Sequence, residues 1–434
     1  MRVQGITYEE LAEEFGTPLY VYDADRLTEA VTGLRAALHP GLEVFYSLKA
    51  NPNVSVYATL RAGGARAEVS SLVELRTALA AGTPPEDVVF LGPGKSRREL
   101  AACLDAGVYA VVVESFDELA RIERLAAERD RRQRVLLRVN PALAISGSRL
   151  TMGGKPRQFG IDEEQVLAAG DLTAAYRHAD VAGVHVYMGT RILDPEVVGK
   201  NTRYILDLAE RVAEATGIRL DAVDIGGGLG VPYFDGEREL PPGAVADEIN
   251  PLLDKFAGAH PDTRLIMESG RYLAGRAGVY VMRVEYVKDS MGERFAVADG
   301  GTHHHMAAVG IGSFVKRNFP ATLLTERATG EPEPWNVTGP LCTPNDSVLK
   351  QAPLPPLRPG DLVGVRNSGA YGPTASPGLF LSHGYPAEVL VRDGAAHLVR
   401  ARDEPDDLLR PQRLIDPTDR QATDHQATDQ GRQF

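Results

Sequence analysis

The sequence contains little cysteine and little tryptophan: two cysteines and one tryptophan among 434 residues. Cys103 and Cys342 alone cannot build a disulfide framework or a cysteine-rich zinc site, and such scarcity is typical of proteins of a reducing cytoplasm. No apolar stretch reaches about 18 residues, so we expect no membrane span. Residues 1–16 are acidic and lack the apolar core of a secretory signal, so we expect none there.

Basic residues are also in the minority. Lys and Arg number 47 against 59 Asp and Glu, which gives a net charge of −12. An acidic chain makes nucleic acid a poor default partner. With 43% hydrophobic residues and this length, the chain is long enough to bury a sizeable core without metals or disulfides, and two domains are expected.

Short apolar, β-branched runs alternate with helical stretches over residues 30–275. Strands that alternate with helices indicate parallel βα units, and eight of them fit a TIM-type (β/α)8 barrel. The eight runs are VFYSL from Val44, ARAEV from Ala65, VVFL from Val88, YAVVV from Tyr109, VLLRV from Val135, VAGVHVY from Val181, AVDIG from Ala222 and RLIME from Arg264.

Three of these runs are followed by the pattern S-x-x-E, beginning at Ser71, Ser96 and Ser115. This pattern is typical of a capping box, in which the serine and the glutamate satisfy free N–H groups at a helix start. Its recurrence after successive runs supports the register of the βα units.

The pattern of hydrophobic residues changes after residue 275. Residues 276–412 contain alternating or β-branched runs separated by glycine and proline, which predicts a mostly antiparallel C-terminal β domain. The run LYVYD from Leu19 is also strand-like, and we expect residues 1–29 to join this domain. Residues 413–434 are polar and contain QATD twice, so we expect a disordered tail.

In a TIM barrel the active site lies at the carboxyl ends of the strands. The chemically capable residues at the predicted strand ends are Lys49, Glu68, Arg138, His185, Tyr187, Thr190, Gly226, Gly227, Gly228, Glu268, Gly270 and Arg271. Taken singly, Lys49 could be a lysine at the rim of the barrel and the three glycines a flexible turn. Glu268 and Arg271 could be a surface ion pair. Together, a lysine, a glycine loop for phosphate and an acid match the needs of pyridoxal phosphate, which takes a Schiff-base lysine, a phosphate cradle and a partner for its ring nitrogen.

Five ordered motifs carry a resemblance to a known family: YSLKANP at 46–52, GGGL at 226–229, ESGR at 268–271, GPLCTPND at 339–346 and SGAY at 368–371. With them the chain, from about residue 16 to 410, resembles the fold-type III pyridoxal-phosphate enzymes, the group of ornithine and diaminopimelate decarboxylases. The family's fold is a TIM barrel followed by a β domain.

The resemblance implies a role for each motif residue. Lys49 resembles the Schiff-base lysine, and Glu268 the partner of the pyridine nitrogen. Cys342 resembles a proton donor supplied across the interface of a homodimer with shared active sites. The residues similar to the family's phosphate ligands are Gly226, Gly227, Gly228, Thr190, Arg271 and Tyr371, and those at family positions near the cofactor are Glu68 and Arg138.

Two departures from the family bear on the cofactor and the substrate. Tyr187 stands where a histidine usually stacks on the ring, with His185 two residues earlier, and a tyrosine can stack as well. Thr343 stands where the family has an acid that holds a distal amine, so neither ornithine nor diaminopimelate fits comfortably. The candidate substrate contacts are Thr343, Asp346, Lys316 and Arg317.

The segments MGGKPRQFGI at 152–161, GTHHHMAA at 301–308 and KRNFP at 316–320 resemble decarboxylases of specialised metabolism. One kind acts on glutamate bound to an acyl carrier protein, which is the substrate class expected here, and another on a siderophore intermediate. The family also includes diaminopimelate decarboxylases and non-catalytic regulators similar to antizyme inhibitors, and the sequence leaves both open. A racemase of this fold would carry Arg in place of Glu268.

Three consecutive histidines, His303, His304 and His305, raise the question of a metal site. Neighbouring side chains of a strand point to opposite faces, so three in a row cannot easily share one ion. We therefore expect no metal.

Overall fold

The computed structural model describes residues 1–142, 150–151, 158–309, 317–328 and 330–415. Residues 152–157 of one motif, Lys316 and residues 416–434 of the predicted tail lie outside the described residues. Within the described part, no helix is both long and apolar enough to cross a membrane.

Eight parallel strands close into a barrel, which confirms the predicted TIM-type fold. Their order is β8-β11-β13-β14-β4-β5-β6-β7, and β7 pairs with β8 to complete the ring. Each of the eight predicted runs contributes one strand. The strands are β4 (Leu42–Ser47), β5 (Arg66–Val69), β6 (Val88–Phe90), β7 (Ala110–Val113), β8 (Gln133–Asn140), β11 (Ala179–His185), β13 (Ala222–Asp224) and β14 (Arg264–Ser269).

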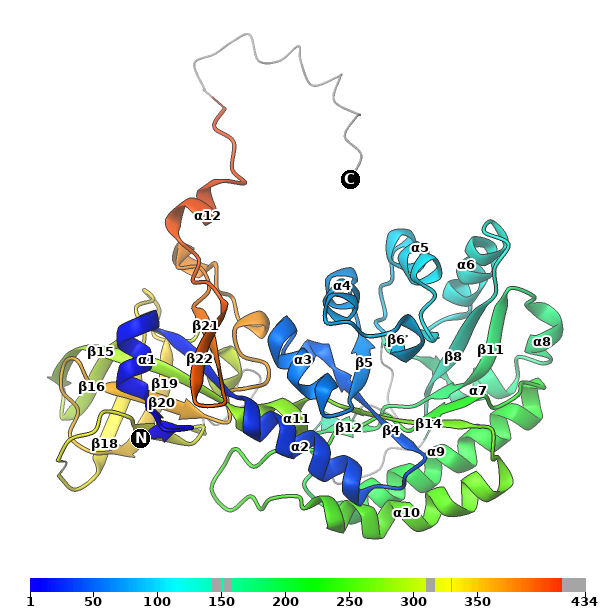
Figure 1. Cartoon of the computed structure of the whole chain (residues 1–434), viewed down its shortest axis with the longest axis horizontal. Helices are drawn as coiled ribbons and strands as arrows, with labels where there is room; N and C mark the ends of the chain where they lie inside the picture. Colours follow the sequence, from blue (N-terminus) through cyan, green and yellow to red (C-terminus); the bar gives the residue numbers. More distant parts are fainter. Residues whose placement is uncertain (143–149, 152–157, 310–316, 329, 416–434) are drawn as a thin grey trace.

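Helices cover the outside of the barrel (Figure 1). They are α2 (Ala24–Ala37), α3 (Val54–Ala62), α4 (Leu72–Ala80), α5 (Arg97–Ala106), α6 (Phe116–Ala127), α7 (Glu163–Leu167), α8 (Leu172–Ala175), α9 (Pro195–Thr216) and α10 (Pro242–Ala259). The short helix α11 (Arg271–Ala274) follows the carboxyl end of β14. Short strands β9 (Leu150–Thr151), β10 (Ile161–Asp162) and β12 (Gly189–Thr190) lie beside the ring.

The three predicted serine caps are present at α4, α5 and α6. Ser71, Ser96 and Ser115 each accept the backbone N–H three residues ahead. Only at Ser96 does the glutamate bond back to the capping residue itself. At the other two helices Glu74 and Glu118 accept the N–H of the residue before the cap, so the same four-residue pattern closes one residue earlier.

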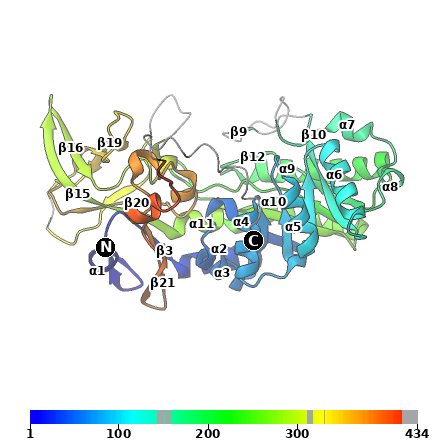
Figure 2. The ribbon, with the colours of Figure 1, turned by 90° about the horizontal axis from the view of Figure 1, so that it is seen from above.

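A second, mostly antiparallel sheet stands beside the barrel (Figures 1 and 2). Its order is β19-β18-β16-β15-β3-β21-β22, with β20 and β17 branching from β15. Its strands are β3 (Leu19–Asp23), β15 (Gly278–Ser290), β16 (Glu293–Ala298), β17 (Ala321–Leu323), β18 (Glu333–Thr338), β19 (Ser347–Leu354), β20 (Leu362–Arg366), β21 (Ala387–Arg392) and β22 (Ala395–Arg400). The sheet is flanked by β1 (Arg2–Val3), β2 (Ile6–Thr7), α1 (Tyr8–Phe15) and α12 (Pro405–Leu409).

The run LYVYD is strand β3, which lies between β15 and β21 in the second sheet. Helix α2 of the barrel begins at Ala24, directly after this strand. The chain therefore enters the second sheet before it builds the barrel and returns to that sheet afterwards.

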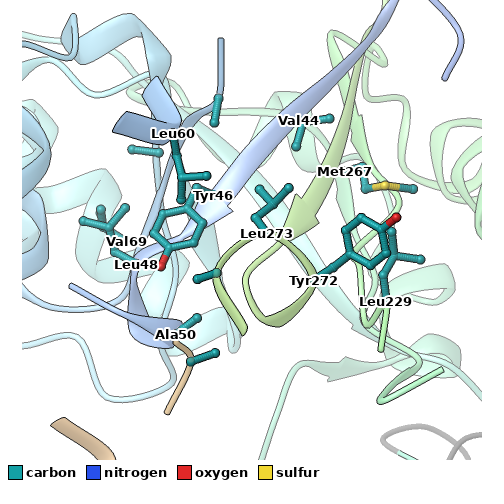
Figure 3. Close-up of a cluster of buried hydrophobic side chains, with 14 of the residues drawn as sticks. Val44, Tyr46, Leu48, Ala50, Leu60, Val69, Leu229, Met267, Tyr272 and Leu273 are labelled. Atoms are coloured by element: carbon teal, nitrogen blue, oxygen red, sulfur yellow. The ribbon is translucent and has the colours of Figure 1, made fainter. Parts of the chain in front are cut away.

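A buried apolar cluster lies between β4, β14 and α11 (Figure 3), and it packs the turn that follows β4 against the barrel. Its labelled members are Val44, Tyr46, Leu48, Ala50, Leu60, Val69, Leu229, Met267, Tyr272 and Leu273. Leu48 and Ala50 are almost fully buried on either side of Lys49, so the cluster fixes the backbone of that residue.

Candidate active site

Lys49 lies in a short 3-10 turn (Leu48–Ala50) at the carboxyl end of β4. Its Nζ donates a hydrogen bond of 2.8 Å to Oε2 of Glu68, which is 1% exposed at the end of the next strand. Burial alone lowers the pKa of Lys49, but the carboxylates of Glu68 and Glu268 outweigh it and raise that pKa above its ordinary value. The structure thus holds an amine between two acids at the mouth of the barrel.

Glu268 is a buried acid that is paired with a histidine. It is 2% exposed on β14, and its Oε1 lies 3.1 Å from Nε2 of His185, which is fully buried on β11. Because a carboxylate can only accept, Nε2 carries the hydrogen of this bond. Burial raises the pKa of Glu268, but His185, Lys49 and Arg138 lower it below its ordinary value, so Glu268 is a carboxylate.

Asp224 completes a buried trio with His185 and Glu268. One side-chain atom from each of the three lies within 4.8 Å of the other two. Oδ1 of Asp224 accepts the N–H of Gly226 at 2.9 Å. Burial and the nearby charge of Glu268 raise the pKa of Asp224 well above its ordinary value. At an effective dielectric constant of about 20, two carboxylates this close repel by at least ~3 kcal/mol.

The glycine loop that follows β13 has no room for side chains. A Cβ at Gly227 would overlap the carbonyl oxygen of Glu268, and one at Gly228 would overlap that of Gly189. Gly226 and Gly228 also have positive φ angles, of 66° and 98°. Bare backbone N–H groups packed this closely form a cradle for an anion.

Arg271 lies beside this cradle at the start of α11. Its Nη1 donates to the hydroxyl of Tyr233 at 3.0 Å, and its guanidinium lies 4.4 Å from the ring centroid of Tyr371. Within the described part of the chain, its buried Nε has no hydrogen-bond partner. A buried guanidinium with an uncommitted N–H is suited to a phosphate group. Gly270, just before it, lies against Ala50 and Ser47 of the lysine turn.

Arg138 is held away from solvent by a partner that the sequence did not suggest. Its Nη1 donates to Oε1 of Glu114 at 2.7 Å, and its guanidinium lies 4.8 Å from the ring of Phe159. Oε2 of Glu114 accepts the N–H of Gly160 at 3.1 Å. Glu114 thus fixes the arginine at the end of β8.

Tyr187 and Thr190 lie on the segment that runs from the end of β11 into β12. Burial raises the pKa of the Tyr187 phenol, while the charge of Lys49 opposes that shift. A neutral ring within the field of Lys49 is suited to the stacking role expected from the sequence.

Cys342 lies in the turn between β18 and β19, and hydrogen bonds to Asp346 fix this turn. Cys342 is a free, exposed thiol. The buried carboxylate of Asp346 accepts hydrogen bonds from the N–H and the hydroxyl of Thr302 and from the N–H of Leu341, at 2.7, 2.9 and 2.8 Å. Asp346 is therefore occupied within its own chain, whereas Thr343, three residues earlier, is partly exposed.

Arg317 is exposed, and its contacts are with Phe234 and Asp235. Its guanidinium lies 4.4 Å from the ring centroid of Phe234 and donates to the carbonyl of Asp235 at 3.3 Å. Both contacts are on the loop that follows the glycine cradle, next to Tyr233. Lys316, its predicted companion, lies outside the described residues.

His303 and His304 lie in a turn and His305 follows it, so the strand geometry assumed in the argument against a metal is wrong. His304 Nε2 bonds the carbonyl of Gly384 at 2.9 Å, and His305 Nε2 bonds the hydroxyl of Ser368 at 2.8 Å. The rings of His303 and His304 lie 3.7 Å apart. Burial lowers the pKa of all three, to about 4, 3 and 3 in chain order, so these residues are neutral core side chains.

Three residues of the site were not predicted from the sequence: Glu114, Asp224 and Tyr233. Asp224 gave a usable signal, because it is an acid inside the apolar run AVDIG next to the glycine loop. Glu114 was hidden in the acidic start of a helix, and Tyr233 in a loop without a motif.

These residues fit pyridoxal phosphate. Lys49 supplies the amine for covalent attachment, the glycine loop and Arg271 the phosphate site, and Glu268 a buried carboxylate for the ring nitrogen. The cradle that a Cβ would fill and the uncommitted Nε of Arg271 are the two observations that favour a phosphate group here.

Comparisons with known proteins agree with this site. Residues 25–275 match the family model described as pyridoxal-dependent decarboxylase, pyridoxal binding domain. The L-glutamyl-[BtrI acyl-carrier protein] decarboxylase of Niallia circulans is 39% identical over 93% of this chain and 95% of its own. The diaminopimelate decarboxylase of Methanothermobacter thermautotrophicus is 34% identical over 95% of both chains.

A solved structure extends the comparison to three dimensions. Diaminopimelate decarboxylase from Helicobacter pylori, crystallised with L-lysine, superposes with a TM-score of 0.84 at 30% identity and covers 93% of this chain and 98% of its own. The chain belongs to the pyridoxal-dependent decarboxylases of fold type III and is an enzyme that uses pyridoxal phosphate to remove a carboxyl group from an amino acid.

Proposed function

We propose that this enzyme decarboxylates a glutamyl group bound to a carrier protein, in specialised metabolism. The observation that carries the proposal is Thr343, a partly exposed neutral side chain next to Cys342. Asp346, the nearby acid of the same segment, offers no free carboxylate for a distal ammonium, since its own chain occupies it. The 39% identity to a decarboxylase named for carrier-bound glutamate supports the same substrate class.

Bound pyridoxal phosphate supplies an electron sink for the pair of electrons left when the carboxylate departs. Glu268 holds a proton at the ring nitrogen, since His185 and the nearby cations keep it ionised. Lys49 would make the covalent attachment, and Glu68 orients its Nζ. Tyr187 would stack on the cofactor ring, and Arg271, the glycine loop, Thr190 and Tyr371 would hold its phosphate.

We further propose a homodimer in which Cys342 serves the partner's active site. Cys342 is exposed and lies in the turn between β18 and β19 of the second sheet, whereas Lys49 lies in the barrel. Asp346 acts as a positioning residue that fixes the turn carrying the thiol. The thiol would deliver a proton to the α-carbon after carbon dioxide leaves. Both cysteines are free, which supports the reducing cytoplasm as the compartment.

Arg317 is the proposed grip for an anionic part of a larger substrate, because it stands exposed beside the loop at 233–237. Lys316 is the proposed second cation. A free diamino acid gains nothing from either residue. Its ammonium would lose water without a charged partner, which costs about 3–5 kcal/mol, or roughly two to four orders of magnitude in rate or affinity.

The test compares carbon dioxide release from glutamate on a carrier protein, free glutamate and free diaminopimelate under one set of conditions. We expect the carrier-bound substrate to react fastest. Thr343→Asp should then raise turnover of diaminopimelate at least tenfold, because it restores a carboxylate for the distal ammonium. Asn345→Asp, which adds the same charge two residues away, is the matched control and should leave that turnover unchanged.

The second candidate is diaminopimelate decarboxylase, which the 34% identity to an enzyme of that name favours. Efficient turnover of free diaminopimelate by the unmodified enzyme would establish it and contradict our proposal. Release of carbon dioxide from a siderophore intermediate alone would assign the enzyme to siderophore assembly instead. A holoenzyme that released none from any of these substrates would match a non-catalytic regulator.

A further inference from the structure

Three adjacent strands of the barrel end in buried ionisable side chains. His185 on β11 and Asp224 on β13 are direct register partners, and Glu268 lies on β14, the next strand. His185 and Asp224 are fully buried, and Glu268 is 2% exposed. The proposed chemistry uses Glu268, but it assigns nothing to Asp224.

The two acids of this trio have very different partners. Glu268 has a hydrogen bond from His185 and the fields of Lys49 and Arg138. Within the part of the chain that the structure describes, Asp224 accepts one hydrogen bond, from the N–H of Gly226 to Oδ1. Among the described residues, its buried Oδ2 has no hydrogen-bond partner. An unpaired charge on such an oxygen is costly to bury, whereas a neutral carboxylic acid is far less so.

Asp224 is also connected to both halves of the cofactor site. The N–H of Gly226 is bonded to Asp224, and the carbonyl of the same Gly226 accepts the N–H of Glu268 at 2.8 Å. One glycine thus links Asp224 to the phosphate loop on one side and to the acid for the ring nitrogen on the other. Loss of the Asp224 acceptor would therefore disturb both.

We propose that Asp224 is a positioning residue that stays a neutral carboxylic acid and fixes the glycine loop relative to Glu268. Because Asp224 keeps its proton and is neutral, Glu268 is the single negative charge beside the ring nitrogen. The charged and titratable groups that face Asp224 are Glu268, Glu68, Lys49 and His185. The proposal rests on the cofactor site and is independent of which substrate the enzyme takes.

The test uses the holoenzyme and two variants. Asp224→Asn keeps a carbonyl oxygen for Gly226 and mimics a neutral acid, so we expect cofactor affinity within about threefold of the parent and the same pH dependence of the cofactor's absorption. Asp224→Ala removes the acceptor of a buried N–H, and we expect cofactor binding about ten- to hundredfold weaker. Asp299→Asn, beside the second sheet, is the matched control and should bind cofactor as the parent does.

Infrared spectroscopy of the parent holoenzyme near neutral pH, labelled at aspartate, reads the proton directly. We expect a band of a neutral carboxylic acid that disappears in Asp224→Asn and persists in Asp299→Asn. Absence of that band, a tenfold loss of cofactor affinity in Asp224→Asn, or a shift in its pH dependence would overturn the proposal. The infrared band and the pH dependence of Asp224→Asn decide the matter even where Asp224→Ala does not fold.

Discussion

The backbone N–H of Tyr371 donates a hydrogen bond of 2.7 Å to the carbonyl of Ala50, the residue after Lys49. Tyr371 lies in the segment that follows β20 of the second sheet, and its ring lies against the guanidinium of Arg271. The second sheet therefore does more than flank the barrel: it fastens the lysine turn and closes the phosphate site.

The glycine loop should tolerate no added carbon at Gly227. We expect Gly227→Ala to weaken cofactor binding at least a hundredfold, because its Cβ would overlap the carbonyl of Glu268 and push β14 away from the loop. Cofactor dissociation followed by absorbance checks this. Gly243→Ala, in α10 where no atom lies within 4 Å of the new carbon, is the control and should bind cofactor normally. Equal affinity in the two variants would contradict the cradle.

Shared active sites can be tested by mixing two inactive enzymes. Lys49→Ala lacks the amine and Cys342→Ala lacks the proton donor, so neither should decarboxylate substrate. After subunit exchange we expect about one quarter of the parent activity, since about half of randomly paired dimers are hybrids and each holds one intact site. Exchange is verified by mass-tagged subunits. No recovery in verified hybrids would place Cys342 in its own subunit's site.

The buried histidines should make the protein sensitive to acid. Burial lowers the pKa of His305 to about 3, from an ordinary value of about 6.5. Below pH ~6.5 the unfolded chain binds more protons than the folded one, so stability is lost as the pH falls from there toward 3. At pH ~5 this residue alone lowers the free energy of unfolding by about 2 kcal/mol relative to neutral pH.

We expect His305→Gln to remove about 2 kcal/mol of that pH dependence, because glutamine does not titrate and can still bond Ser368. Urea unfolding at both pH values measures the difference. His397→Gln, at an exposed position of β22, should leave the pH dependence unchanged. An equal effect of the two substitutions would show that His305 is protonated in the folded enzyme.

The barrel was accessible from sequence because each strand is short, apolar and followed by a helix start. Ser71, Ser96 and Ser115 marked three helix starts correctly, since a cap depends on local chemistry alone. The histidine turn was misread although a local signal was present, since Gly300 and Gly301 precede it. The N–H groups of His304 and His305 bond back to the carbonyl of Gly301 at 3.1 and 3.3 Å. The distant contacts to Gly384 and Ser368 hold the imidazole rings.

Some residues of the candidate site could be identified from the sequence, and others could not. Lys49 and Glu268 were identifiable because a charged residue at the end of an apolar strand is costly without a purpose. Glu114 was not identifiable, because its role is to pair with Arg138 on the neighbouring strand, 24 positions along the chain. Pairings across strands need the register of the barrel, which periodicity does not supply.

The placement of β3 has a consequence for synthesis on the ribosome. Leu19 pairs with Val281 on one side and with Ala387 on the other, so the earliest strand of this sheet waits for neighbours translated long afterwards. The barrel strands, in contrast, are all complete by Ser269. We therefore expect the nascent chain to close its barrel first, with an unpaired β3 vulnerable to aggregation until translation is nearly finished.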